Sequence, residues 1–343
     1  MEQKEILALT LPELTDELTQ MGEKSFRAKQ IFHWLHAAKA ESFEEMTNLP
    51  KALRASLSER YSLTPVRVET SQLARRGDTA KYLLALPDGS LVEAVWMKYH
   101  YGVSLCISSQ VGCRMNCAFC ASGLLGRERN MTAAEMLREV YCLEKTGGER
   151  ISHVDIMGTG EPLDNYDEVL RFIRQITDPL AGGISQRNIT LSTCGLVPGI
   201  RRLAEEKLAV TLAISLHAPD NELRSRLMPV NRAYPLEQLI PACDDYFAAT
   251  GRRVSYEYAL MDGVNAGEAD ARRLAALLAG KNCHVNLIPV NPVEEKTFSR
   301  PGAAQIAAFK MALENAGINV TIRREMGEDI DGACGQLRLR TKS

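Results

Sequence analysis

The feature that most constrains the fold is a regular alternation of strand-like and helix-like segments from about residue 100 onward. Seven segments are predicted as strands: 104–108, 153–157, 188–193, 210–216, 254–260, 284–289 and 319–323. Several of them are almost entirely apolar, which is typical of strands that helices cover on both faces. Helices are predicted between most of them, for example at 133–145, 167–176, 269–279 and 303–316. This order predicts a parallel α/β sheet, open or curled into a barrel, with functional residues at the strand ends.

The first hundred residues follow two other patterns. Ser25 is predicted to cap a helix that begins at Phe26, and a second helix is predicted after Pro50. Short alternating segments then appear, and residues 81–86 and 91–97 flank a Pro-Asp-Gly-Ser turn that predicts a hairpin. We therefore divide the chain into a helical accessory domain (1–62), a short β segment (63–99) and an α/β core (100–343).

Composition and charge exclude several classes of protein. Lysine and arginine total 41 against 43 aspartates and glutamates, so overall basicity gives no argument for nucleic-acid binding, although a local basic face remains open. No apolar run approaches roughly 18 residues, and the charged start lacks the apolar core of a signal peptide. We expect a cytoplasmic monomer without a membrane span, whose nine cysteines do not form a disulfide framework.

Three of these cysteines form a C-x3-C-x2-C run directly after the first predicted strand of the core: Cys113, Cys117 and Cys120. Three thiolates on one short loop can converge on a single cluster or metal ion. A structural zinc site would need a fourth ligand, for which Cys142 is the candidate within the next thirty residues or so. Three cysteines on a 4Fe–4S cluster instead leave one iron open, and an open coordination position marks a site that does chemistry.

The cysteine run, with an aromatic residue before its last cysteine, resembles the signature of radical S-adenosylmethionine (SAM) enzymes. Further segments resemble one subfamily, the dual-specificity ribosomal and transfer RNA adenine-C2 methyltransferases known as RlmN, with Cfr as a close relative. Its most specific pieces are residues 106–113 and 331–337, and others are 26–30, 157–162, 191–195, 215–219 and 286–292. The resemblance covers almost the whole chain and implies a partial (β/α)6 barrel that binds a 4Fe–4S cluster and SAM.

The resemblance also implies a set of contacts with SAM at the strand ends. The matching positions are Gly160, Glu161, Ser192, Ser215, Leu216, His217 and Asn291. Taken singly, polar residues at such places are more often turn or capping residues than ligands. Cys194 stands where the family commonly has serine, and we assign it no role.

Two further cysteines, Cys334 and Cys106, match the residues that carry the mechanism in this family. Carbon 2 of adenine is electron-poor, so it cannot attack the methyl group of SAM as a nucleophile. The family's route places a methyl group on the cysteine matching Cys334, and a radical derived from a second SAM activates that methyl group, which adds to adenine. The residue matching Cys106 then attacks the Cys334 sulfur, and the resulting disulfide needs a thiol reductant to reset the enzyme. Glu93 matches the proposed proton acceptor, although a glutamate on an alternating strand usually faces solvent.

The implied activity is methylation of adenine carbon 2 in the peptidyl-transferase region of 23S rRNA and beside the anticodon of some tRNAs. An electron donor such as flavodoxin or ferredoxin would serve the cluster. Lys24, Arg27 and Lys29, with Phe26 and Trp34, fit the family's small RNA-holding domain, and the target base would have to leave its stack.

Three alternatives stay open. A Cfr-type enzyme would methylate carbon 8 of adenine instead. Another radical SAM enzyme, acting on a peptide or small molecule, would leave Cys106 and Cys334 without a joint task. A non-catalytic iron–sulfur or zinc protein would leave Gly160, Glu161 and Asn291 unexplained.

Overall fold

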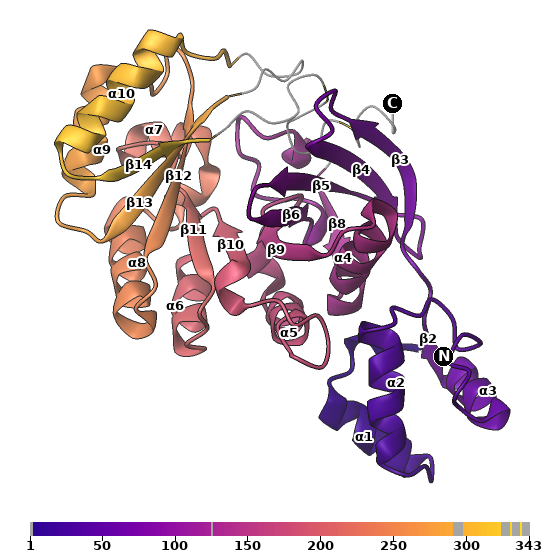
Figure 1. Ribbon diagram of the computed structural model, residues 1–343. Coiled ribbons are helices and arrows are strands. Elements are labelled where there is room, and N and C mark those ends of the chain that lie inside the picture. Colours follow the sequence, from indigo (N-terminus) through magenta and orange to yellow (C-terminus); the bar gives the residue numbers. More distant parts are fainter. Residues whose placement is uncertain (1–2, 125, 291–297, 324–329, 331–336, 338–343) are drawn as a thin grey trace.

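A ten-stranded sheet forms the centre of the molecule, a computed structural model that describes residues 3–124, 126–290, 298–323, 330 and 337 (Figure 1). Its strand order is β14-β13-β12-β11-β10-β9-β6-β5-β4-β3. The strands are β3 (Arg67–Leu73), β4 (Thr79–Ala85), β5 (Leu91–Tyr99), β6 (Gly102–Ile107), β9 (Ile151–Ile156), β10 (Ile189–Thr193), β11 (Thr211–Ser215), β12 (Val254–Leu260), β13 (Cys283–Pro289) and β14 (Asn319–Ile322). Neighbours from β6 to β14 pair in parallel, whereas β3 to β6 pair antiparallel.

Helices connect the parallel strands and cover the outer face of the curved sheet (Figure 1). They are α4 (Ala133–Gly147), α5 (Tyr166–Ile176), α6 (Val197–Glu205), α7 (Asn221–Leu227), α8 (Leu236–Thr250), α9 (Glu268–Leu277) and α10 (Ala303–Asn315). The apolar strands are buried as predicted; Leu212, Ala213 and Ile214 of β11 are all 0% exposed. The predicted α/β barrel fold is confirmed, with β14 as a further parallel strand at the edge of the sheet.

The predicted hairpin of the β segment is also present, since β4 and β5 pair antiparallel across the expected turn. This hairpin does not stand apart from the core. Strand β5 pairs with β6, with Val95 opposite Cys106, so β3–β5 continue the barrel sheet on its β6 side. The boundaries at 62/63 and 99/100 stay a prediction, but the strands on the two sides of the second boundary share one sheet.

Residues before β3 fold into a small helical lobe, drawn in indigo at the lower right of Figure 1. It contains β1 (Lys4–Glu5), α1 (Leu11–Gln20), α2 (Phe26–His36), α3 (Lys51–Arg60) and β2 (Tyr61–Ser62). Helix α2 begins where expected, but the predicted Ser25 cap is wrong: its side chain makes no capping hydrogen bond. The reason is that Ser25 is already helical (φ −53°, ψ −32°), whereas a capping side chain needs an extended backbone.

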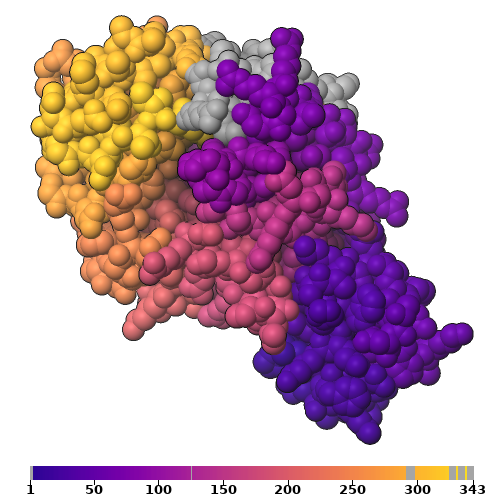
Figure 2. Space-filling model, in the orientation of Figure 1, coloured from indigo at the N-terminus to yellow at the C-terminus, as the bar shows by residue number. Residues whose placement is uncertain are grey.

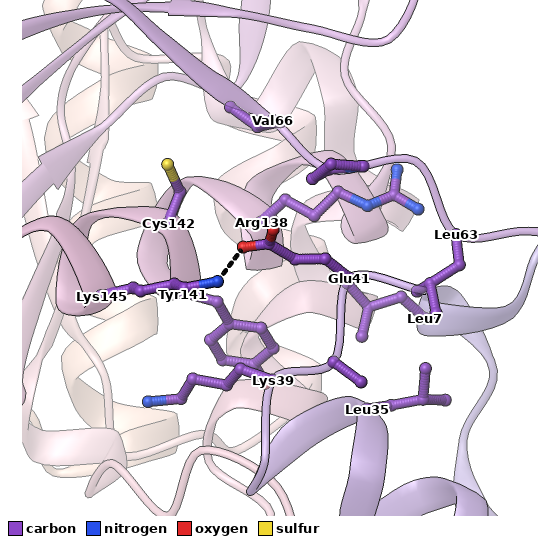
Figure 3. A pocket seen from close by; sticks show the side chains of 12 residues that line it. Leu7, Leu35, Lys39, Glu41, Leu63, Val66, Arg138, Tyr141, Cys142 and Lys145 are labelled. Carbon is purple, nitrogen blue, oxygen red and sulfur yellow. Dashed lines mark hydrogen bonds and ion pairs between the residues drawn. The ribbon is translucent and has the colours of Figure 1, made fainter. Parts of the chain in front are cut away.

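The lobe packs directly against α4 and α5, as Figure 2 shows. Arg171 on α5 donates to the carbonyl oxygen of Ala8, and His36 Nδ1 lies 2.8 Å from the hydroxyl group of Tyr141 on α4. A small pocket of about 30 Å³ remains between the lobe and α4, where Lys145 Nζ lies 2.8 Å from Glu41 Oε1 (Figure 3). No helix in the described part of the chain is long and apolar enough to cross a membrane.

His36 gives this docking interface a predictable pH dependence. Burial lowers the pKa of His36 from 6.5 to about 3. Between these two pKa values His36 is protonated in the unfolded chain but not in the folded chain, so the free energy of unfolding falls as the pH drops below about 6.5. The loss should be roughly 1.4 kcal/mol per pH unit for this residue. We expect the free energy of unfolding, measured with urea between about pH 7 and about pH 5, to change less steeply with pH in His36→Phe than in the unchanged protein. An equal change with pH in the two proteins would contradict this.

Candidate active site

A cavity of about 360 Å³ opens at the carboxyl ends of the parallel strands and extends along β4 and β5. Its wall takes residues from β4–β6, from β9–β13 and from the loop after β6. The predicted site residues that border it are Cys106, Cys113, Cys117, Cys120, Gly160, Glu161, Ser192, Ser215 and His217. The fold thus gathers into one cavity residues that the sequence separates widely.

Four predicted site residues are placed differently. Leu216 is fully buried but does not border the cavity, and its backbone nitrogen donates to the Glu257 carbonyl oxygen at 3.0 Å. Glu93 is buried and does not border the cavity, although its ion-pair partner Lys81 does. Asn291 and Cys334 lie outside the described residues, whereas their neighbours Val290 and Ile330 border the cavity.

The cysteine loop follows β7 (Gln110–Gly112), which pairs with β8 (Arg127–Asn130). A side chain at Gly112 would overlap the carbonyl oxygen of Gly126, so only glycine allows this close pairing. Beyond it, Cys113 donates its backbone N–H to the same oxygen at 3.0 Å, which fixes the start of the loop. The hairpin thereby holds the loop at the cavity mouth.

Burial raises the pKa of the Cys113 thiol to about 11, and it raises the pKa of Cys117 as well. Each neighbouring thiolate adds to this shift, so the loop needs a strong positive charge to hold three thiolates together. In the part of the chain that the structure describes, no three His, Cys, Asp or Glu residues could hold a single metal ion. The cysteines that bind a 4Fe–4S cluster can lie farther apart than the ligands of a single metal ion, because each cysteine binds a different iron. Cys142 lines the small pocket beside the helical lobe, which argues against a zinc site closed by that residue.

The loop after β9 approaches the end of β6 and the start of β7 very closely. A Cβ atom at Gly158 would lie 2.6 Å from the Ile107 carbonyl oxygen, and one at Gly160 (φ +115°) would lie 2.8 Å from the Gln110 nitrogen. Glu161 follows, and its carboxylate accepts hydrogen bonds from the backbone nitrogens of Cys194 (2.7 Å) and Leu163 (3.1 Å). Burial raises the pKa of Glu161. Its side chain is therefore held in place by backbone donors while bordering the cavity.

His217 has a left-handed backbone (φ +56°), which is strained for a residue other than glycine. Its Nδ1 accepts a hydrogen bond from the Ala259 nitrogen at 2.9 Å, so the ring hydrogen sits on Nε2. Burial lowers the pKa of His217 to about 3, and the edge of the ring packs against Phe119. His217 is thus a neutral hydrogen-bond donor throughout the physiological pH range.

Two further residues organise the site and were missed from the sequence. Arg224 is fully buried and donates to the carbonyl oxygens of Cys194 (2.7 Å), Ser215 (3.2 Å) and Leu216 (3.2 Å). It thereby ties the end of β10 to the end of β11. A single arginine in a short amphipathic helix carries no sequence signal for such a role.

The second missed residue is Lys81 on β4. Its Nζ lies 3.0 Å from Glu93 Oε2, and the two side chains are 1% and 3% exposed. The expectation that a strand glutamate at this position usually faces solvent is therefore wrong for Glu93. The pattern could not reveal the pair, because alternating charged residues are equally typical of an exposed strand face.

Comparisons with known proteins agree with this arrangement. A family model described as the radical SAM superfamily matches residues 107–275, and one described as the ribosomal RNA large subunit methyltransferase N-terminal domain matches residues 4–63. A protein of Lachnoclostridium phytofermentans named "Probable dual-specificity RNA methyltransferase RlmN" is 57% identical over 98% of this chain and 95% of its own length. A Lachnospira eligens protein of the same name is 52% identical over 97% and 95%. The crystal structure of a radical SAM methyltransferase from Sphaerobacter thermophilus matches with a TM-score of 0.93 and 44% identity, covering 97% of this chain and 98% of that one.

The steric fit at Gly160 yields a prediction for SAM binding. In Gly160→Ala the new methyl group would have to displace Gln110, whose side chain accepts a hydrogen bond from the Glu161 nitrogen at 2.9 Å. We expect at least about tenfold weaker SAM binding in anaerobic calorimetry, because both the backbone strain and the shift of Glu161 act at the cavity. Gly302→Ala is the matched control, since a Cβ atom there meets open space. Unchanged SAM affinity in Gly160→Ala would show that this loop does not contact SAM.

Proposed function

This chain belongs to the RlmN family of radical SAM RNA methyltransferases, and from that premise we propose that it methylates carbon 2 of adenine. The proposed targets are an adenine in the peptidyl-transferase region of 23S rRNA and an adenine beside the anticodon of some tRNAs. The observation that carries the proposal is the single cavity, which is bordered both by the three cysteines of the loop and by Cys106. The methyl relay gives Cys106 a task in that wall, whereas a fifth cysteine that borders the cavity, Cys194, has no assigned role.

The residues around the cavity suit a 4Fe–4S cluster and SAM. Cys113, Cys117 and Cys120 are free thiols on one loop and would hold the cluster. The SAM contacts would come from the two loop residues Gly160 and Glu161 and from a second group at other strand ends: Ser192, Ser215, Leu216 through its backbone, His217 and Asn291. When bound, the cluster and SAM supply the radical chemistry, for which a flavodoxin or ferredoxin would deliver the electron.

The chain's own residues would carry the methyl group and release the product. Cys334 would hold the methyl group, and Ile330, four positions earlier, borders the cavity. Four residues reach at most about 14 Å, so Cys334 has the cavity within range. The Cys106 thiolate would attack the Cys334 sulfur, so that a disulfide forms and the bond from sulfur to the product carbon breaks. The product carbon keeps the electron pair of that bond and takes a proton from solvent, which completes the methyl group. Glu93 would take the proton that leaves adenine, and a thiol reductant would restore both cysteines.

The helical lobe would hold the RNA, as an accessory domain of residues 1–62. Phe26 is 48% exposed, and the Arg27 guanidinium carbon lies 4.9 Å from the centre of its ring. Exposed Lys24 and Lys29 lie on either side of this pair in the sequence. Aromatic faces and basic groups of this kind suit bases and phosphates. We propose that the enzyme acts in the cytoplasm as a monomer.

Mass spectrometry of anaerobically purified protein tests the methyl relay. We expect the peptide that contains Cys334 to carry the added mass of one methyl group, and Cys334→Ala to lose both this modification and all RNA methylation. Cys142→Ala is the control, because Cys142 lies in the pocket beside the helical lobe. An unmodified Cys334 in protein with an intact cluster and added SAM would contradict the relay. Chromatography of digested RNA should then yield 2-methyladenosine, and finding 8-methyladenosine instead would favour the Cfr-type alternative.

A further inference from the structure

We propose that Lys81 is a positioning residue that keeps the Glu93 carboxylate ionised and in place beside the cavity. The inference rests on the proposed function, in which Glu93 takes the proton that leaves adenine. Lys81 itself borders the cavity, and Glu93 lies directly behind it.

Strand pairing brings the two residues together. Lys81 on β4 lies opposite Val95 on β5, and Val95 lies opposite Cys106 on β6. Side chains two positions apart on a strand share a face, so Glu93 points to the same side of the sheet as these three residues. The pair therefore lies on the same face of the sheet as the cysteine that would release the product.

Burial makes the charge of Glu93 dependent on its neighbour. A carboxylate removed from water takes up a proton unless a cation or strong donors compensate for the lost hydration. The Lys81 ammonium group, at 3.0 Å, provides that compensation. Lysine in its charged form has three donors and no acceptor, so it cannot take the proton from adenine itself. Glu93 is the acceptor of the pair, and Lys81 acts through it.

Among the described residues, two acidic groups lie near this pair. Cys106 on β6 is on the same face of the sheet, and Glu139 on α4 accepts a hydrogen bond from the nitrogen of Ser108 at 3.3 Å, while the hydroxyl group of Ser108 donates to the Glu93 carbonyl oxygen. A charge on either would be negative and would oppose ionisation of Glu93. Burial raises the pKa of Glu139 well above its usual value.

The proton balance of the step is simple. Radical addition leaves one unpaired electron on the adduct, and that electron would return to a bound cluster. The hydrogen on carbon 2 then leaves as a proton, the electron pair of the C–H bond stays on the ring, and the Glu93 carboxylate becomes a carboxylic acid beside the Lys81 ammonium group. The ammonium group keeps its hydrogen bond to the carbonyl oxygen of that acid. Glu93 later returns the proton to solvent.

Four variants test the inference: Lys81→Met, Lys81→Arg, Glu93→Gln and the double variant Lys81→Met/Glu93→Gln. Methylation of Cys334 is measured first, because it needs a folded chain, the cluster and SAM but no proton acceptor for adenine. Single-turnover formation of 2-methyladenosine is then followed as a function of pH. Lys98→Met is the matched control, since Lys98 forms an exposed ion pair with Glu149.

We expect normal Cys334 methylation in all variants. Lys81→Met should slow methyladenosine formation at least about tenfold at neutral pH, and the deficit relative to the unchanged protein should shrink as the pH rises. Lys81→Arg should retain most of the rate, because it keeps the charge. In the Glu93→Gln background, Lys81→Met should have no further effect, since Lys81 acts only through the carboxylate.

The contrary results distinguish a failure of this inference from a failure of the proposed function. If Lys81→Met reacts at the unchanged rate while Glu93→Gln is slow, the inference fails and the proposed function stands. If the double variant reacts more slowly than Glu93→Gln alone, Lys81 acts directly and the inference is wrong. If the unchanged protein methylates Cys334 but forms no 2-methyladenosine, the proposed function fails and takes the inference with it.

Discussion

The hydroxyl group of Ser108, at the end of β6, connects this strand to two other parts of the site, β5 and the loop after β9. It donates to the Glu93 carbonyl oxygen at 2.7 Å and accepts from the Thr159 nitrogen at 3.0 Å. Ser108 is 0% exposed, so water cannot replace either bond, and a buried backbone group left without a partner is costly. One side chain at the end of β6 thus sets the distance between the Glu93 strand and the loop after β9. The cysteine loop begins five residues later, at Cys113, so the position of Ser108 also limits where that loop can start.

Neutral groups reinforce that junction on the side of the cysteine loop. Gln110 accepts from the Glu161 nitrogen at 2.9 Å and donates to Asn130 at 2.8 Å, while Asn165 donates to the Ser109 carbonyl oxygen at 2.9 Å. Amides suit this task because each offers donors and an acceptor without adding charge. Gln110 also donates to the Asp164 carboxylate at 3.0 Å, so the amides connect to one charged group at the edge of this network. The neutral His217 ring extends the same principle to the opposite wall.

The sequence was sufficient to predict the elements that depend on local pattern. Apolar runs such as that of β11 predicted buried parallel strands, and the turn between β4 and β5 predicted their hairpin. The cysteine run predicted a loop at the cavity. The features it could not predict depend on tertiary neighbours. Whether Lys81 faces solvent or Glu93 is decided by the pairing of β5 with β6, and whether Ser25 caps α2 is decided by its backbone angles. Leu216 was matched to a contact position, yet its side chain belongs to the core behind the wall.

The antiparallel strands β3–β5 extend the sheet, and β4 and β5 add a second kind of surface to the cavity. One part of its wall is suited to ligand binding and another to proton transfer. Parallel strands expose their carboxyl ends at one edge, so β9, β10 and β11 contribute loop and strand-end residues such as Gly160 and His217, which suit the binding of a ligand. Strands β4 and β5 border the cavity along their length instead, and they present side chains from the middle of a strand. A residue between two paired neighbours is held more rigidly than a residue in a loop. Proton transfer requires an acceptor within hydrogen-bond distance of the atom it deprotonates, so a strand would suit the role proposed for Glu93 and its cation. The β segment before the core contributes two strands to the wall of the cavity in addition to joining the helical lobe to the core.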